Sequence, residues 1–162
     1  MYSLFYTTDI IVHFIEITLI YFIFGSAGSY KGVNILYNKI GPKNSISDEN
    51  GCPTFFGTFI LGLLFSGAYL IYYQFLKNIF PMRGGNRYAL FITCLVLFMF
   101  FSNTYIYYNT NKFFNKTLKL RFDISTPSGC PTIGGTIFHG FLLALFGFIF
   151  PVFLNLKRIP KK

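Results

Sequence analysis

Four long apolar stretches, separated by polar and basic segments, dominate the sequence. They cover Tyr6–Phe24, Thr54–Leu76, Tyr88–Tyr108 and Ile133–Leu154. Each approaches or exceeds the ~18–20 residues that an α-helix needs to cross the hydrocarbon core of a bilayer. No part of the chain has the composition of a separate soluble domain. The pattern therefore predicts an all-α integral membrane protein with four transmembrane helices.

The composition supports the membrane interpretation. Of the 162 residues, 53% are hydrophobic and only 12% are charged. A soluble domain carries about a quarter charged residues, so this chain has too few charges to cover a surface that faces water. No Lys or Arg precedes Lys31, and the first apolar stretch contains Asp9 and Glu16. We therefore expect a retained membrane helix there, because a signal peptide has a basic segment before its apolar core.

The tetrapeptide Gly-Cys-Pro-Thr occurs twice, at Gly51–Thr54 and Gly129–Thr132, each time directly before a long apolar stretch. The match continues without gaps over 51–76 and 129–154. Each half also has an earlier apolar stretch that is followed by a basic, Asn-rich segment. The sequence therefore predicts a tandem repeat of two-helix membrane units, 1–80 and 81–162, which cross the membrane in the same sense.

Both tetrapeptides have the composition of a helix start. Proline is favoured in the first helical turn, where its missing N–H is not needed, and a threonine oxygen can accept from a free amide of that turn. Each following helix has small residues four positions apart: Gly62 and Ser66 in the first half, Gly140 and Ala144 in the second. This spacing lets helix backbones approach closely in lipid. We expect these two helices to contact each other, or to bind equivalent partners through the same surface.

Cys52 and Cys130 occupy the same position in the two repeats, at the same membrane surface. A disulfide between them would join the halves, provided that their Cα atoms lie within about 7 Å. The alternative is two unpaired residues at helix starts, and the sequence leaves both open. Neither cysteine belongs to a Cys-x-x-Cys pair, which argues against dithiol catalysis and a zinc knuckle. Cys94 lies inside an apolar stretch and is interpreted as a packing residue.

Asp9, His13 and Glu16 lie on one stripe of the first predicted helix, because their spacings are four and three. Charged residues at the centre of a membrane helix cost about 2.5–3.5 kcal/mol each, so this stripe should face another helix, a polar cavity or a partner. His139 is the other histidine of the chain. These four residues could form a metal site or a proton path. The simpler interpretation is an interhelical hydrogen-bond cluster that fixes the packing of the first helix.

The net charge of +9 lies in the loops and the C-terminal tail. If the helices alternate in direction, loops 25–53 and 109–131 share one side of the membrane, and the 14 Lys and Arg residues divide equally between the two sides. The positive-inside rule therefore gives no orientation. We expect the basic residues to meet anionic headgroups or acidic protein, and not nucleic acid, because they are dispersed. Several tyrosines near the ends of the stretches predict an interfacial aromatic belt: Tyr21, Tyr72, Tyr73, Tyr105, Tyr107 and Tyr108.

The sequence contains no recognisable catalytic motif. Met82–Arg87, with the sequence MRGGNR, lacks the pattern of a phosphate-binding loop and follows no strand. The loops contain no arrangement of a nucleophile with histidine. We therefore expect no enzymatic activity, no cofactor and no resident metal.

The second repeat, SGCPTIGGTIFHGFLLALF, resembles a motif of small multi-pass membrane proteins in large icosahedral double-stranded DNA viruses. The residues that carry the resemblance are Gly129–Thr132, Gly135, His139 and a phenylalanine at Phe141 or Phe146. The first repeat keeps the tetrapeptide and Gly57 but has Leu61 at the histidine position. The resemblance implies a virion protein of the inner membrane, a minor capsid component beneath or bonded to the capsid shell.

The leading hypothesis is therefore a structural membrane protein of four helices that links a virion inner membrane to its capsid shell. Its partners would be the lipid bilayer with its anionic headgroups and other membrane or capsid proteins. A second hypothesis is a small transporter or channel that uses the stripe of Asp9, His13 and Glu16. A third is an accessory subunit of an organellar membrane complex.

Overall fold

The computed structural model describes residues 2–40, 45–79, 87–119 and 122–156. For residues 2–10, 13, 73, 75–79, 87 and 148–156 within these ranges, the description covers the backbone alone. The described residues form helices joined by short turns and contain no strand. This confirms the all-α prediction. The boundary expected between the repeats, at residues 80 and 81, lies outside the described residues.

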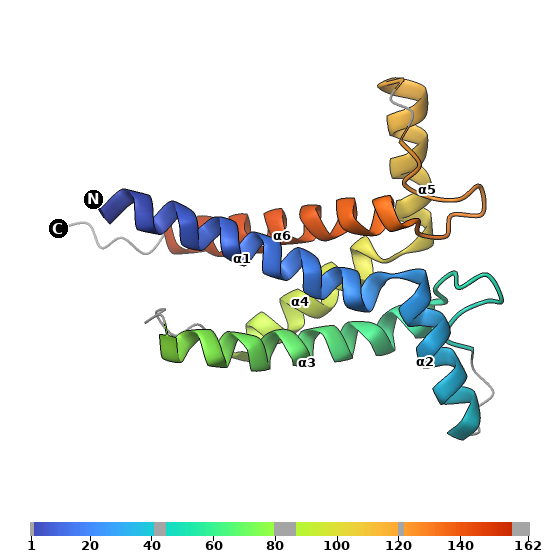
Figure 1. The fold of residues 1–162 in the computed structure, drawn as a ribbon, viewed down its shortest axis with the longest axis horizontal. Helices are drawn as coiled ribbons and strands as arrows, with labels where there is room; N and C mark the ends of the chain where they lie inside the picture. Colours follow the sequence, from blue (N-terminus) through green and yellow to red (C-terminus); the bar gives the residue numbers. More distant parts are fainter. Residues whose placement is uncertain (1, 41–44, 80–86, 120–121, 157–162) are drawn as a thin grey trace.

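Four helices run along the length of the molecule and two short ones leave it at one end (Figure 1). The long helices are α1 (Tyr2–Gly25), α3 (Phe55–Ile79), α4 (Arg87–Phe101) and α6 (Ile133–Leu156). The short helices are α2 (Ala27–Ile40) and α5 (Thr104–Lys112), and α5 continues into a π-helical turn at Phe113–Thr117. Figure 1 shows α2 and α5 pointing in opposite directions, across the long axis, at the end where α3 and α6 begin. We call this the turn end.

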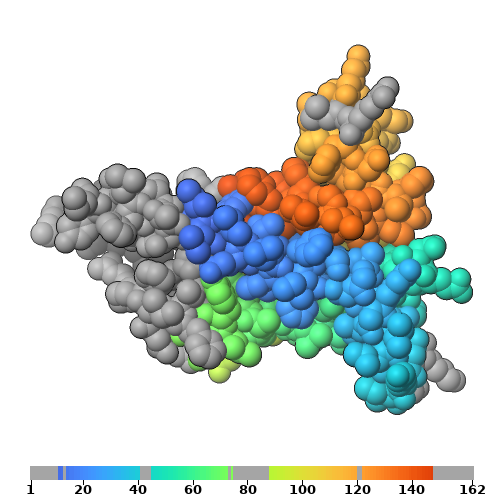
Figure 2. Space-filling view, viewed as in Figure 1, coloured from blue at the N-terminus to red at the C-terminus, as the bar shows by residue number. Residues whose placement is uncertain are grey.

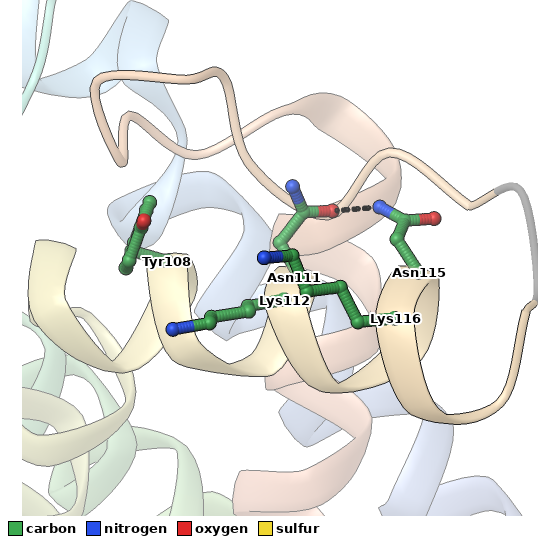
Figure 3. Close-up of a pocket in the computed structure, with 5 residues that line it drawn as sticks. All are labelled: Tyr108, Asn111, Lys112, Asn115 and Lys116. Carbon is green, nitrogen blue, oxygen red and sulfur yellow. Dashed lines mark hydrogen bonds between the residues drawn. The ribbon is translucent and has the colours of Figure 1, made fainter.

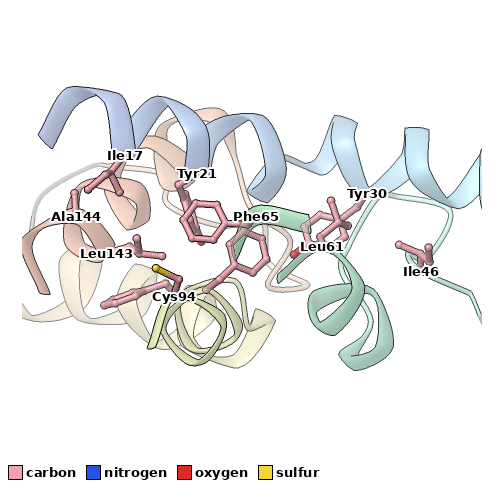
Figure 4. Close-up of a cluster of buried hydrophobic side chains, with 11 residues drawn as sticks. Ile17, Tyr21, Tyr30, Ile46, Leu61, Phe65, Cys94, Leu143 and Ala144 are labelled. Atoms are coloured by element: carbon pink, nitrogen blue, oxygen red, sulfur yellow. The ribbon is translucent and has the colours of Figure 1, made fainter. Parts of the chain in front are cut away.

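Each long helix packs mainly against a long helix from the other half of the sequence. α1 packs most extensively against α6, and α4 packs most extensively against α3. Smaller contacts between α1 and α3, and between α4 and α6, complete the bundle. The core between the helices is rich in aromatic side chains, including Tyr21 and Phe65 (Figure 4). The ring of Phe98 packs on both of them. Each half of the sequence therefore buries its first helix largely against the last helix of the other half.

Cys94 lies buried in this core and is not bonded to another cysteine. Its side chain packs among the apolar residues that the helices turn inward. The structure therefore agrees with the interpretation of Cys94 as a packing residue.

The helix lengths agree only in part with the four predicted spans. Among the described residues, α3 is long and apolar enough over Phe55–Tyr72 to cross a membrane by itself. α4 and α5 meet that requirement only together, as a pair bent by 55°. Within the described side chains, the apolar segments of α1 and α6 are shorter: they cover Phe14–Gly25 and Ile133–Gly147.

The stretch expected as one helix over Tyr88–Tyr108 is broken, and that prediction is wrong in this detail. α4 ends at Phe101, and Asn103 begins α5 by accepting the Tyr105 backbone N–H at 2.8 Å with its side-chain Oδ1. Asparagine is a favoured helix N-cap because its side chain replaces the missing backbone acceptor. Ser26 has the same role at the start of α2, where it accepts the Ser29 N–H at 3.3 Å. Segments expected as loops therefore contain α2, the last residues of α5 and the π-helical turn that follows it.

Candidate functional site

The two Gly-Cys-Pro-Thr turns have the same hydrogen bonds at equivalent residues. In the first turn, the Thr54 N–H donates to the Ile46 carbonyl at 3.1 Å, and Ser47 pairs with Pro53 in an isolated β-bridge. In the second, the Thr132 N–H donates to the Ile124 carbonyl at 3.3 Å, with a bridge between Ser125 and Pro131. Each turn is thus a short loop closed directly before a long helix.

Threonine and glycine set the backbone of each turn. The Thr54 hydroxyl oxygen accepts the Gly57 N–H at 3.0 Å, and Thr132 accepts the Gly135 N–H at the same distance. The expectation that threonine caps the helix is confirmed. Gly51 and Gly129 have positive φ angles of 84° and 86°, which residues with a Cβ rarely adopt. Glycine is therefore required for the sharp entry into each turn.

A disulfide joins the two turns in the structure. It links Cys52 to Cys130, whose Cα atoms lie 4.6 Å apart, within the usual range for such a bond. Both cysteines are buried. The sequence had left this pairing open, since it could place the two residues at one membrane surface but could not give their distance. The disulfide makes the turn end one covalently closed unit.

Two asparagines that the sequence analysis did not single out attach the short helices to the turns. The Oδ1 atom of Asn34, in α2, accepts the Ile46 N–H at 2.8 Å. The Oδ1 atom of Asn111, in α5, accepts the Ile124 N–H at 3.0 Å. The repeat has one additional residue between Asn111 and Ile124, so an alignment without gaps hides this equivalence. An alignment that allows a gap ahead of the turns would reveal it.

A buried polar cluster lies in the bundle beneath the turns. The Tyr21 hydroxyl is hydrogen bonded to the Ser102 hydroxyl at 3.0 Å and to the Tyr107 hydroxyl at 3.2 Å. His139 stacks on the Tyr107 ring, with ring centroids 3.8 Å apart. Tyr21 and Tyr107 were expected in the interfacial belt, and their complete burial shows that this expectation is wrong for them.

His139 stabilises the end of α4. Its Nδ1 atom lies 2.7 Å from the Phe101 carbonyl oxygen, which belongs to the last residue of that helix. The last carbonyls of a helix have no partner within the helix, so an N–H donated by the histidine satisfies one of them. This geometry makes Nδ1 the protonated nitrogen of the ring. Nε2 is buried without a hydrogen-bond partner among the described residues.

The structure tests only part of the predicted cluster of Asp9, His13, Glu16 and His139. The side chains of Asp9 and His13 lie outside the described residues. Glu16 is half-buried on α1. The described partners of His139 are the Phe101 carbonyl and the ring of Tyr107. A cluster of all four residues therefore remains a prediction, and for His139 the observed role is that of an interhelical hydrogen bond.

The small residues contact equivalent partners. A Cβ added to Gly62 would meet Leu95 and Phe98 of α4, and one added to Gly140 would meet Thr18 and Tyr21 of α1. Ser66 and Ala144, four residues further along, are fully buried. We expected these surfaces either to contact each other or to bind equivalent partners, and the structure shows equivalent partners. α3 packs on α4 through Gly62, and α6 packs on α1 through Gly140.

Burial raises the pKa of the Tyr30 hydroxyl in α2 above its ordinary value, so this group is neutral. The turn end offers two places where an ion could approach. Asp48 lies with its carboxylate within 4.8 Å of the Cys52 and Cys130 sulfur atoms. While the disulfide is intact, these sulfurs cannot bind a metal as thiolates.

The second place is a shallow groove of about 210 Å³ on α5 (Figure 3). Its lining consists of two lysines, Lys112 and Lys116, and three uncharged polar residues, Tyr108, Asn111 and Asn115. Figure 3 shows Asn115 bonded to Asn111, with its amide nitrogen 3.0 Å from the Asn111 oxygen. The groove can attract an anionic group, because its only charged residues are positive.

Comparison with protein-family models, with curated proteins and with solved structures finds no match for this chain.

Proposed function

We propose that this chain is a structural integral membrane protein in which two tandem units form a four-helix transmembrane bundle. The observation that carries the proposal is the polarity of the bundle, which is apolar on its outside. Large hydrophobic side chains are exposed on the outer face of every long helix, including Ile15, Leu64, Val96 and Phe141. A soluble protein rarely exposes contiguous apolar surface on this scale.

The inside of the bundle supports the same proposal. Its polar groups bond to one another across helices, as Tyr21 does with Ser102 and Tyr107. Figure 2 shows α1 and α6 lying side by side across one face. Exposed residues of these two helices include Ile11, Leu19 and Ile137. Lipid would cover such a face without a desolvation cost, and the interior hydrogen bonds would hold the helices together.

The turn end suits a structural role. The disulfide and the two asparagine contacts hold both turns and both short helices in one arrangement. A rigid surface of this kind could hold a protein layer above the membrane. The resemblance of the second repeat to viral inner-membrane proteins supports a virion inner membrane as the location, with the capsid shell as that layer.

Reconstitution in sealed liposomes tests the proposal. We expect the chain to stay in the membrane after alkaline carbonate extraction and to cause no proton or cation flux above that of protein-free liposomes. Release by carbonate would overturn the integral membrane assignment. Flux that is lost in Glu16→Gln would support a transporter or channel instead. If the location is correct, particles purified from the source of the sequence contain the chain and release it only with detergent.

A further inference from the structure

The two short helices expose apolar residues at equivalent positions. In α2, Leu36 and Ile40 are four residues apart, so they lie on one side of the helix, and they are 61% and 82% exposed. In the turn that follows α5, Phe113 is the equivalent of Leu36 and is 51% exposed, while Thr117 takes the position of Ile40. Each short helix therefore has outward apolar surface that no described residue covers.

Aromatic contacts show which way these faces point. The ring of Tyr37, the neighbour of Leu36, packs on Phe56 in the first turn of α3, with centroids 5.7 Å apart. The ring of Phe114, the neighbour of Phe113, packs on Phe138 near the start of α6 at 5.1 Å. Both contacts hold the short helix against the outer surface of a long helix, and Leu36 and Phe113, one residue before the contacting rings, stay exposed beside it. That surface is the one the proposed function assigns to lipid.

The side of each short helix opposite its exposed apolar residues carries asparagines. In α2, Asn34 and Asn38 lie roughly 160° from Leu36, and Asn34 bonds the first turn, whereas Lys39 lies only roughly 60° from Leu36, which follows from 3.6 residues per turn. The equivalents in the second half are Asn111, Asn115 and Lys116, and the groove of Figure 3 is on this side of α5. Each short helix is therefore amphipathic, with asparagines on the side of the turns and an exposed lysine beside the apolar residues.

We infer that α2 and α5 lie in the membrane interface, with Leu36, Ile40 and Phe113 inserted between lipids at the acyl boundary and the lysines at headgroup level. The inference deepens the proposed function, on which it rests. An amphipathic helix with lysines on its polar face binds an interface by burying its apolar face about 5–10 Å deep. The two helices leave the turn end in opposite directions across the bundle axis, as helices in a membrane plane would (Figure 1).

A protein partner would be a different occupant of the same faces. Lipid is favoured because Leu36 and Phe113 lie opposite the asparagines that bond the turns, on helices that pack against α3 and α6. The lysines add to this, since each basic residue near an anionic surface contributes about 1 kcal/mol. A partner that capped the turn end would meet the asparagine sides first.

Single-tryptophan variants test this inference, because the chain has no Trp of its own. The apolar-side variants are Leu36→Trp and Phe113→Trp, and the matched controls on the polar side are Asn38→Trp and Asn115→Trp. The probe is vesicles of phosphatidylserine and phosphatidylcholine brominated near the carbonyl end of its chains. We expect brominated lipid to remove most of the emission of the apolar-side variants, while iodide in the water removes most of the emission of the controls.

A reporter on the bundle separates this inference from the proposed function. Val96→Trp lies on the outer face of α4, where the wild-type side chain is 58% exposed. If lipid quenches Val96→Trp while iodide quenches the apolar-side variants as strongly as the controls, the inference fails and the membrane bundle stands. If iodide quenches Val96→Trp as well, the proposed function fails. A mobility shift on reduction checks that each variant has kept the disulfide and therefore its fold.

Discussion

Gly57 and Gly135 each lie in the first turn of a long helix, where the backbone of the preceding loop crosses close by. A Cβ at Gly57 would collide with the carbonyl of Ile46, and one at Gly135 with the carbonyl of Ile124. These are the same carbonyls that accept hydrogen bonds from Thr54 and Thr132. The glycines therefore allow the loop to close onto the helix start.

Replacement of Gly57 or Gly135 by Ala should destabilise the protein strongly. The added methyl group meets backbone, which cannot rotate away, so the loop must move and lose its hydrogen bonds. We expect each variant to lower the free energy of unfolding in detergent micelles by about 2 kcal/mol or more. SDS titration followed by circular dichroism measures this.

Gly67→Ala and Gly147→Ala are the matched controls, because a Cβ at either position meets no described atom within 4 Å. Alanine is a better helix former than glycine, so we expect these variants to be neutral or more stable by up to about 1 kcal/mol. Equal losses at all four glycines would contradict the close approach of the turns.

At this scale the sequence predicted part of the site. The repeated tetrapeptide identified Thr54 and Thr132 as helix caps and placed Cys52 and Cys130 at equivalent positions. It did not show why glycine is needed at Gly57 and Gly135. The carbonyls that exclude a side chain there belong to Ile46 and Ile124, which lie outside the repeated tetrapeptide. Whether two cysteines are bonded depends on a distance that residue spacing alone does not contain.

The end of α4 at Phe101 determines where several polar side chains lie. Because α4 stops at Phe101, Ser102 and Tyr107 reach the core and meet Tyr21 of α1 there. One straight helix over the same stretch would have placed the tyrosines at the membrane interface. Because of the break, tyrosines expected in an aromatic belt form a hydrogen-bond cluster that joins α1, α5 and the residue after the end of α4.

Tyr21→Phe tests the cluster. The variant keeps the ring in the core and removes the hydroxyl that is bonded to Ser102 and Tyr107, so it should lower the free energy of unfolding by about 1–2 kcal/mol. Tyr105→Phe is the control, because Tyr105 is 71% exposed on α5, and we expect its change to stay within about 0.5 kcal/mol. An equal effect of both variants, by the same SDS titration, would show that the cluster does not stabilise the bundle.

The break was hard to predict because the apolar residues continue through it. Hydropathy over Tyr88–Tyr108 is as expected of a span, and only Ser102 and Asn103 mark the end of α4. A short pair of polar residues is common within membrane helices, so the pattern favoured an unbroken one. The equivalent break at Ser26 was placed more accurately, since the apolar stretch ends there.

In the molecule as a whole, the two halves of the sequence interlock. α1 packs mainly on α6, and α4 mainly on α3, so each half contributes one helix to each main pair. The disulfide then joins the halves at the turn end. The repeated motif indicated equivalent helices in the two halves, but not which helices pack together, since either arrangement uses the same apolar surfaces.

The disulfide also bears on orientation, which the equal division of basic residues leaves open. Disulfides persist in oxidising compartments and are rare where cytosolic reductants reach them. We therefore expect the turn end to face the oxidising side of the membrane, and the N-terminus, residues 80–86 and the C-terminal segment to face the cytosol.

Glycosylation mapping in microsomes tests whether the chain crosses the membrane four times. Acceptor tags are placed singly after residue 42, 83, 120 or 162, in an Asn115→Gln background that removes the chain's own acceptor sequence, Asn-Lys-Thr. Four crossings with the turn end on the oxidising side predict glycans on the tags at 42 and 120 and none on the tags at 83 and 162. Tags at 42 and 120 on opposite sides of the membrane, or a tag at 83 on the same side as both, would contradict a bundle that crosses the membrane four times.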